Sequence, residues 1–281
     1  KNSVNMAAMS AIAQQVGAAM FYAISSLLVI FINKIVLSSH DFPSFNFLGF
    51  AQFLTTALVM WLLKICGIVK IESLSSSTIG AVLPLTALFL MNVLSGLGGT
   101  QRVSLPMFTV LRRFSILMTM LMEQRLGMSR SSRAVQFSVA LMLGGAIIAA
   151  LSDLSFDVPG YAMILANDFF TAAYGITVKR IISGKSVSKT GLLFYNSVFS
   201  SVVMILVLLG SNGEVKKIAE FPQWRENWFI ALFVLASSMG SVLNYSIFLC
   251  TSVNSALTTT VVGCLKNVLT TYIGMVLGGD Y

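Results

Sequence analysis

The chain has 281 residues, of which 56 % are hydrophobic and 10 % are charged, and its mean hydropathy is +0.86. A soluble domain of this size must present more polar surface to water, so the composition excludes that class and predicts a protein embedded in a lipid bilayer. The formal net charge is +8, and we expect no nucleic-acid partner because so few residues are charged.

Apolar stretches recur along the whole chain at about the 20-residue length that a helix needs to cross a bilayer core of about 30 Å. Continuous apolar runs, such as residues 87–91, lack the alternation of barrel strands, so we expect an all-α polytopic fold. The windows predict nine spans, at residues 12–36, 44–66, 78–100, 104–123, 134–151, 159–182, 190–210, 227–250 and 254–278.

Prolines and glycines inside these spans indicate bends and close helix contacts. Pro84 and Pro106 lie within the third and fourth spans, where we expect kinks. Small residues let helix backbones approach, and we expect this role at Gly96, Gly98, Gly99, Gly144 and Gly145.

Basic residues are distributed unevenly between alternate connections. One side carries nine of them, namely Lys64, Lys70, Arg125, Arg130, Arg133, Lys179, Arg180, Lys185 and Lys189. The other side carries four, namely Arg102, Lys216, Lys217 and Arg225. The positive-inside rule therefore predicts that the first side and the amino terminus are cytosolic.

An internal repeat links elements five helices apart. The fourth span has Leu111-Arg112 and the ninth has Leu265-Lys266, each placing a cation in mid-span, and residues 33–36 resemble residues 179–182 more weakly. An offset of five reverses the direction of crossing, so we expect an inverted repeat of five plus five helices. The copies would be residues 1–155 and 156–281, with the tenth helix absent from this chain because the sequence stops at residues 278–281.

Five ionisable residues inside the predicted spans are candidates for a functional role, namely Lys34, Arg112, Arg113, Lys266 and Asp168. Each costs at least about 2.5 to 3.5 kcal/mol in hydrocarbon, so each calls for an explanation. If the one acid neutralises one cation, several positive charges remain for an anionic ligand, such as a nucleotide sugar or a nucleoside monophosphate. Two alternatives stay open: Lys34 snorkels to the interface, and Arg113 pairs with Asp168 or with helix carbonyls.

Polar residues on the ninth span form a stripe. Thr259, Gly263, Lys266 and Thr270 are spaced by four, three and four residues, which stacks them on one helix face, and Asn267 borders them. This face can line a binding site, with Gly263 letting a ligand approach the backbone.

Other polar residues can contribute to the same site. Tyr22 and Asn33 are eleven residues apart, almost three turns, and so share a face of the first span. The seventh and eighth spans are interrupted by groups that could read a nucleobase or bond neighbouring helices, namely Tyr195, Asn196, Ser197, Asn244 and Tyr245.

The sequence offers few residues that could form a metal or cofactor site. His40 is the single histidine and lies in a polar connection, and the three cysteines are scattered without ligand spacing, so we expect neither a metal nor a cofactor. A membrane enzyme would need carboxylates near the reacting bond, and Asp168 is the single acid among the five candidate charges named above. The chain is therefore expected to be a carrier rather than an enzyme; a channel is a further alternative.

Residues 194–197 (Phe-Tyr-Asn-Ser) and 263–267 (Gly-Cys-Leu-Lys-Asn) resemble the FYNN and GALNK motifs of nucleotide-sugar transporters in the drug/metabolite transporter superfamily. Residues 32–34, 105–115 and 254–260 extend the resemblance over nearly the whole chain. It implies that Asn196 and Ser197 recognise the base, and that Gly263, Lys266 and Asn267 bind ribose, phosphate and sugar.

Two departures from these motifs bear on the substrate. Ser197 replaces the second Asn of FYNN, and the order Lys266-Asn267 inverts the Asn-Lys of GALNK, which turns the charge by about 100° around the helix. Both disfavour a GDP-mannose carrier. The pattern is more similar to the branch for UDP-glucuronic acid and UDP-N-acetylhexosamines, which implies exchange of a cytosolic UDP-sugar for lumenal UMP in the Golgi, or in the endoplasmic reticulum.

The predicted substrate-binding set is Tyr22, Asn33, Lys34, Arg112, Tyr195, Asn196, Ser197, Asn244, Thr259, Gly263, Lys266 and Asn267. A GDP-sugar carrier and a sugar-phosphate or phosphate antiporter of the same superfamily are the alternatives. The sequence leaves open which sugar is carried and whether two copies form a homodimer.

Overall fold

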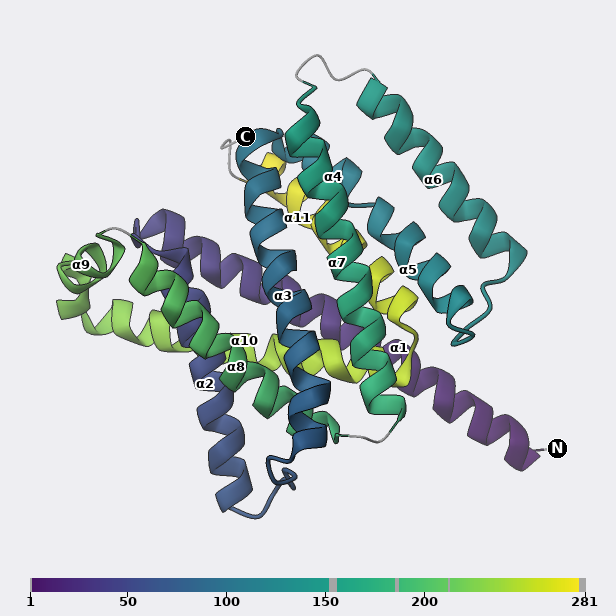
Figure 1. Ribbon diagram of the computed structural model, residues 1–281, viewed down its shortest axis with the longest axis horizontal. Helices are drawn as coiled ribbons and strands as arrows, with labels where there is room; N and C mark the ends of the chain where they lie inside the picture. Colours follow the sequence, from purple (N-terminus) through teal and green to yellow (C-terminus); the bar gives the residue numbers. More distant parts are fainter. Residues whose placement is uncertain (1, 152–155, 185–186, 212, 278–281) are drawn as a thin grey trace. The chain divides into compact units, whose positions relative to one another are not determined.

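A computed structural model describes residues 2–151, 156–184, 187–211 and 213–277, and within these ranges every regular element is a helix (Figure 1). The first half contains α1 (Asn2–Lys34), the π-helical turn η1 (Ile35–Ser39), α2 (Phe45–Ile65), α3 (Ser76–Arg102), α4 (Leu105–Leu111), α5 (Phe114–Arg125) and α6 (Arg133–Leu151). The second half contains α7 (Val158–Ser183), α8 (Lys189–Gly210), α9 (Glu214–Ala219), the 3₁₀ turn η2 (Pro222–Arg225), α10 (Asn227–Val253) and α11 (Ala256–Leu277).

The all-α membrane fold is confirmed. Among the described residues, six helical segments are long and apolar enough to cross a bilayer: Met9–Leu37, Phe45–Ile65, Ser76–Gly96, Arg133–Leu151, Lys189–Gly210 and Asn227–Val253. Their outer faces suit lipid. On α6, for example, Phe137, Leu141 and Ile148 recur at helical spacing and are each at least two-thirds exposed.

The fourth predicted span is two helices rather than one. α4 ends at Leu111, α5 begins at Phe114, and Arg112 and Arg113 form the turn between them. The expected kink at Pro106 is wrong, because this proline lies in the first turn of α4, where its missing N–H is harmless. Pro84 does lie inside a helix, α3.

The chain divides into two compact units, which we describe separately. The α2–α8 unit contains residues 16–86 and 184–249, and its main packing is between α2 and α8. The α5–α7 unit contains residues 1–15, 87–183 and 250–281; in it α7 and α11 pack on α5, and α6 packs on α4 and α5. α1, α3 and α10 contribute residues to both units.

Aromatic residues fasten one end of the α2–α8 unit. Phe42, in the connection before α2, has ring centroids 5.2 Å from Phe221, 5.6 Å from Trp224 and 5.3 Å from Phe233. The Trp224 indole N–H donates to the carbonyl of Ile218 at 2.7 Å, so the ring is also fixed by a hydrogen bond. These contacts hold the connection before α2 against the segment between α8 and α10.

Polar contacts fasten the other end of the same unit. Glu72, in the connection after α2, accepts hydrogen bonds from the backbone N–H and the hydroxyl of Ser188 at 3.1 and 2.9 Å. Ser188 caps α8 by accepting from the N–H of Gly191 at 3.0 Å. A carboxylate at this helix N-terminus is favourable because the exposed N–H groups carry partial positive charge.

The glycine prediction is half right. A methyl group built on Gly96, Gly98 or Gly99 of α3 would lie 2.9 Å from Asn167 Nδ2, 2.5 Å from Met163 Sδ and 2.7 Å from Ile164 Cγ1, respectively, so α3 and α7 pack closely as expected. For Gly144 and Gly145 the structure shows no such approach, because a methyl group there would meet none of the described atoms within 4 Å.

The two glycine sites should therefore differ in their tolerance of alanine. Gly99→Ala forces a carbon against Ile164, which is fully buried, and overpacking of this kind typically costs about 1 to 3 kcal/mol. We expect a lower thermal unfolding temperature in detergent for this variant. Gly145→Ala, which meets open space, is the matched control and should unfold at or above the wild-type temperature; equal losses for both variants would contradict the packing argument.

Candidate functional site

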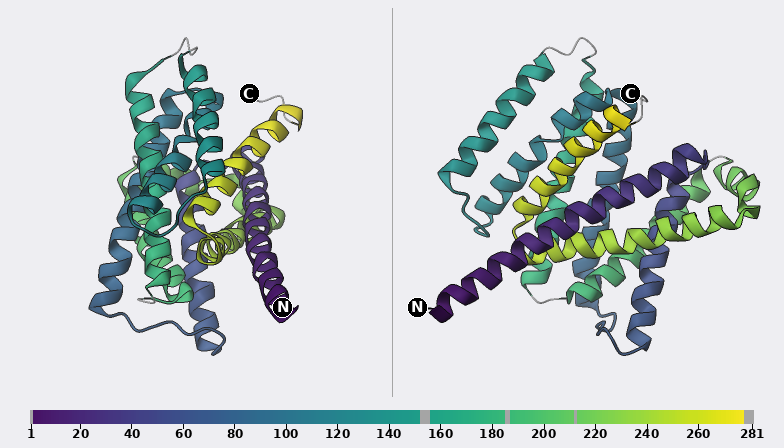
Figure 2. Two further views of the ribbon diagram at one scale, coloured as in Figure 1. Left: turned by 90° about the vertical axis from the view of Figure 1, so that its right-hand side faces the viewer. Right: turned by 180° about the vertical axis from the view of Figure 1, so that it is seen from behind.

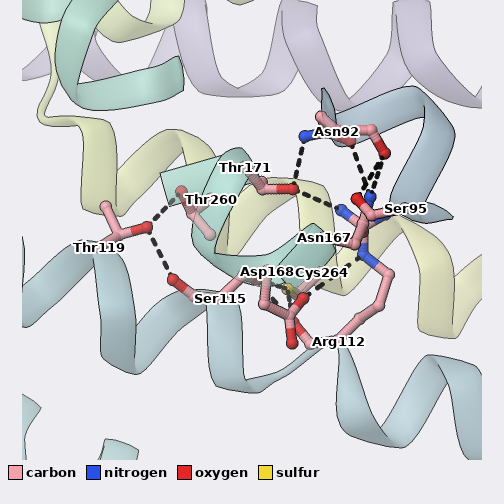
Figure 3. A network of polar contacts seen from close by, with 10 residues as sticks. All are labelled: Asn92, Ser95, Arg112, Ser115, Thr119, Asn167, Asp168, Thr171, Thr260 and Cys264. Carbon is pink, nitrogen blue, oxygen red and sulfur yellow. Dashed lines mark hydrogen bonds and ion pairs between the residues drawn. The ribbon is translucent and has the colours of Figure 1, made fainter. Parts of the chain in front are cut away.

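Arg112 lies at the break between α4 and α5, and its side chain lies against α7 (Figure 3). One guanidinium N–H donates to the hydroxyl of Thr171 at 3.3 Å, and the Phe108 ring lies beneath the charge, with its centroid 5.8 Å away. The Nε atom of Arg112 lies 4.0 Å from Oδ1 of Asp168. The cation is thus held by one weak ion pair, one hydrogen bond and one aromatic face.

Asp168 is fully buried on α7, yet it is poorly bonded. Neither of its oxygens, nor the Arg112 Nε atom, has a hydrogen-bond partner in the part of the chain that the structure describes. A well-formed arginine–carboxylate pair has N–O distances of about 2.7 to 2.9 Å, so this contact is loose. The alternative that Asp168 pairs with Arg113 is wrong, because the acid contacts Arg112.

A hydrogen-bonded group of asparagine and threonine side chains adjoins this pair. The Asn92 amide donates to Thr171 at 2.8 Å, and the Asn167 amide donates to Asn92 Oδ1 at 2.9 Å and to its carbonyl. Thr171 therefore joins Arg112 to a polar contact between α3 and α7 (Figure 3). The buried Oδ1 of Asn167 accepts no hydrogen bond within the described residues.

α11 lies along α5 next to the break (Figure 2). Cys264 Sγ is 3.7 Å from the Arg112 carbonyl oxygen and 3.7 Å from Ser115 Oγ. Lys266 follows two residues later and is near enough to Arg112 for the two charges to repel. The structure thus brings Arg112, Gly263 and Lys266 into one region of the α5–α7 unit.

Thr259 and Asn267, the other two predicted residues of α11, are not among the residues brought together there. Thr259 accepts from the Thr251 hydroxyl at 3.1 Å and donates to the Ser255 carbonyl at 3.3 Å, which places it near the α10–α11 turn, about two helical turns from Lys266. The side chains of Asn267 and Thr270 lie outside the described residues, although the backbone of both is helical.

Three predicted residues on α1 belong to the α2–α8 unit. Tyr22 is buried. The Asn33 amide oxygen accepts from Gln52 at 3.0 Å, and Gln52 also donates to the Ala236 carbonyl at 3.2 Å, so Asn33 takes part in holding α1, α2 and α10 together. Lys34 is exposed at the end of α1.

The remaining predicted residues of this unit lie on α8 and α10. The Tyr195 hydroxyl donates to the Glu72 carbonyl at 2.6 Å, so it is engaged in fastening the unit. Asn196 and Ser197 are buried, and the Asn196 Oδ1 and Ser197 Oγ atoms have no hydrogen-bond partner among the described residues. Asn244 is half-buried on α10.

Several buried polar residues near these positions are missing from the predicted set. Ser200 and Ser26 are fully buried, with hydroxyls that bond to no described group, and they lie one turn after Asn196 and Tyr22. That i to i+4 spacing is the signal that could have found them. Asn92, Asn167 and Thr171 could have been found as polar residues in mid-span. Glu123 is a second buried acid beside Asp168, because it is 1 % exposed within α5.

The α2–α8 unit also contains a cavity of about 390 Å³ between α1, α2, α8 and α10. Its wall is mostly apolar and includes Phe21, Thr56, Leu193, Ser241 and Tyr245. None of the predicted substrate-binding residues lines it, so the cavity does not mark the predicted site. Among the described residues, no three His, Cys, Asp or Glu side chains gather as a metal site would require.

Comparison with known proteins identifies the family. Residues 14–278 match the Triose-phosphate Transporter family. The chain is 45 % identical over 271 residues to the UDP-sugar transporter UST74c of Drosophila melanogaster, covering 95 % of this chain and 72 % of that protein. It is 45 % identical over 271 residues to the UDP-sugar transporter sqv-7 of Caenorhabditis elegans, covering 95 % and 82 %.

A third relative is the nucleotide sugar transporter SLC35D2 of Mus musculus, 40 % identical over 263 residues, which cover 94 % of this chain and 80 % of that protein. The resemblance drawn from the two short motifs is confirmed by these matches, and relatives that are transporters point away from an enzyme. The chain belongs to the Triose-phosphate Transporter family, within the drug/metabolite transporter superfamily.

Proposed function

We propose that this chain is a nucleotide-sugar antiporter that exchanges a cytosolic UDP-sugar for lumenal UMP by alternating access. The names of its relatives support the substrate class. The observation that carries the proposal is the pair of cations, Arg112 and Lys266, on neighbouring helices with one loosely bonded carboxylate beside them.

The charges in this region fit a ligand with two negative charges. Asp168 offsets one of the two cations only weakly, at 4.0 Å and without a hydrogen bond to any described residue. A nucleoside monophosphate, or the diphosphate of a nucleotide sugar, carries about two negative charges near neutral pH. Its oxygens can accept hydrogen bonds from the guanidinium N–H groups, whereas Asp168 makes only an ion pair at 4.0 Å, so the phosphate can compete successfully for Arg112.

The buried amide and hydroxyl groups of the α2–α8 unit suit a nucleobase. Uracil presents an N–H donor between two carbonyl acceptors, and an asparagine side chain can match a donor and an acceptor at that edge. The bare Asn196 Oδ1 and Ser197 Oγ atoms supply such groups. We assign base recognition to Asn196 and Ser197 with the Tyr195 ring. Within the α2–α8 unit we assign lining roles to Tyr22, Asn33, Lys34 and Asn244, and within the α5–α7 unit to Thr259, Gly263 and Asn267.

Alternating access is the expected mechanism of an inverted repeat. α5 and α11 come from spans five helices apart, and they pack in opposite chain directions, since Thr119 contacts Thr260 while Ser115 contacts Cys264. That packing supports an inverted repeat of residues 1–155 and 156–281, completed by a tenth helix. We place the carrier in the Golgi membrane, or in the endoplasmic reticulum, with a cytosolic amino terminus.

A sugar-phosphate antiporter is the second candidate. The family match favours it, because the family is named after the transport of triose phosphates. Such a carrier would use the same cations but would have no need of base-reading groups. The two are separated by competition: UMP but not inorganic phosphate should block UDP-sugar uptake by the proposed carrier.

Lys266→Ala should abolish exchange of UDP-sugar for UMP in proteoliposomes, because one of the two cations that would bind phosphate is lost. Lys266→Arg, which keeps the charge, is the control and should retain measurable exchange. Both variants should fold and insert normally, as judged by size-exclusion profile. Near-normal uptake by the alanine variant would remove Lys266 from the site.

Asn196→Ala should reduce the preference for uridine nucleotides by about tenfold, equivalent to about 1.4 kcal/mol, because a buried base edge loses its partner. The measurement is inhibition of uptake by UMP, GMP and CMP. Ser201→Ala on the same helix is the control, since the Ser201 hydroxyl already bonds the Val198 carbonyl at 2.8 Å. An unchanged order of inhibitors in the Asn196 variant would refute base reading.

Asp168→Asn should tighten the binding of UMP and slow its release. Removing the carboxylate leaves Arg112 without a competing anion, so we expect about a tenfold lower dissociation constant, or about 1.4 kcal/mol, together with slower exchange. Glu220→Gln, which removes an exposed acid 3.8 Å from Lys216, controls for net charge. Weaker or equal binding in the Asp168 variant would show that this acid does not compete with the ligand.

A further inference from the structure

Glu123 is a buried acid to which the mechanism above gives no role. It is 1 % exposed and lies in the last turn of α5. Its Oε1 atom accepts a hydrogen bond from the backbone N–H of Leu257, the second residue of α11, at 3.2 Å. The first N–H groups of a helix have no partner within it, so this carboxylate satisfies one of them from a neighbouring helix.

The turn before α11 is fixed on its other side by a cation. Lys179, near the end of α7, donates to the carbonyls of Ser252, in the last turn of α10, and of Asn254, the residue after that helix. An acid therefore binds the N-terminus of one helix while a base binds the C-terminus of the preceding one, each with the favourable polarity. α5 and α7 together hold the α10–α11 turn.

From Glu123 a row of contacts follows α5 and α11 toward Arg112, and we call it the polar ladder. One turn along, the Thr119 and Thr260 hydroxyls are 3.2 Å apart. A further turn along, Ser115 Oγ is 3.7 Å from Cys264 Sγ, which also lies 3.7 Å from the Arg112 carbonyl (Figure 3). The ladder thus begins at the start of α11 and ends beside Lys266.

The ladder works against a repulsion. Arg112 and Lys266 are like charges near its inner end, where Cys264, two residues before Lys266, lies 3.7 Å from the Arg112 carbonyl, so their repulsion opposes the packing of α11 on α5 there. The hydroxyl and thiol contacts are weak, neutral bonds. Glu123 differs from them because its Oε1 atom accepts a backbone N–H in the first turn of α11, which has no partner within that helix.

The position of Glu123 also lets its bond be exchanged for water. A polar hollow of about 390 Å³ is lined by Glu123, Lys179, Ser129, Asn254, Ser255 and Thr258. The Oε2 atom of Glu123 is buried and bonds to no described group. A water molecule in this hollow could take the place of the Leu257 N–H as a hydrogen-bond donor to the Glu123 carboxylate.

We propose that Glu123 is a positioning residue for transport: it holds α11 along α5, and so keeps Lys266 beside Arg112, in one state of the carrier, and it releases α11 in the other. This inference rests on the proposed function. It makes the polar ladder a contact that forms and breaks once in each exchange cycle.

A disulfide across the ladder tests the opening step. Thr119→Cys with Thr260→Cys is made in a Cys264→Ser background, which keeps a hydrogen-bonding group opposite Ser115. Oxidation should stop exchange of UDP-sugar for UMP in proteoliposomes, and a reductant should restore it. The oxidised protein should still show a thermal shift with UMP, because Lys266 stays beside Arg112.

Exchange by the oxidised protein at the reduced rate would overturn the inference, and so would loss of the UMP shift. Thr119→Cys alone, in the same background, must be insensitive to the oxidant. If neither the wild type nor the reduced variant exchanges the two nucleotides, the proposed function itself fails; if both do and the disulfide changes nothing, only the role of the ladder fails.

Substitution of Glu123 tests the residue itself. Glu123→Ala should raise the KM for UDP-sugar by at least fivefold, and Glu123→Gln, whose amide oxygen can still accept from Leu257, should raise it by less than twofold. A merely structural role would lower expression and unfolding temperature without this rescue in KM. Wild-type KM in the alanine variant, or equal losses in both variants, would overturn the assignment.

Discussion

The weak ion pair between Arg112 and Asp168 is the contact on which the rest of this structure depends. A charge inside a bilayer is tolerated when it is paired, and a pair that satisfies both partners would be inert. Here the guanidinium and the carboxylate are 4.0 Å apart, and the carboxylate oxygens accept no hydrogen bond in the described parts of the chain. In the proposed carrier, this looseness would let a phosphate take the place of the carboxylate beside Arg112.

The break between α4 and α5 makes that arrangement available. In an unbroken α-helix the Arg112 carbonyl would accept from the N–H of Ile116, which here donates to the Arg113 carbonyl at 3.1 Å. The turn instead exposes the Arg112 carbonyl to Ser115, whose hydroxyl donates to it at 2.6 Å, and to the Cys264 thiol. Interrupted helices whose freed backbone groups are bonded by side chains are a common basis for binding sites at membrane depth.

The sequence predicted the helices and the main cations, because apolar length and charge within a span are one-dimensional signals. It could not predict the break, since arginine is a good helix former and nothing local marks residues 112–113 as a turn. The contrast between Gly99 and Gly145 has the same origin: a glycine permits close approach, but only the tertiary packing decides whether a neighbour is there.

The residues of the candidate site were also predicted only in part. Arg112 and Lys266 were found as charges in hydrocarbon, whereas Asn92, Asn167 and Ser200 were passed over because uncharged polar residues in a span usually bond neighbouring helices. Glu123 was missed because it lies at the edge of an apolar window, where an acid is expected to reach water. Its burial follows from the packing of α11 on α5, which no local pattern encodes.

The α2–α8 unit is fastened at both ends, by the Phe42 aromatic group and by Glu72 with Ser188 and Tyr195. A body held in this way resists internal rearrangement, so any nucleobase it accepts would have to fit a surface already formed. Discrimination among bases and handling of phosphate would then reside in different parts of the chain. Mutations could retune one without disturbing the other, which offers a route by which carriers with this architecture diversify their cargo.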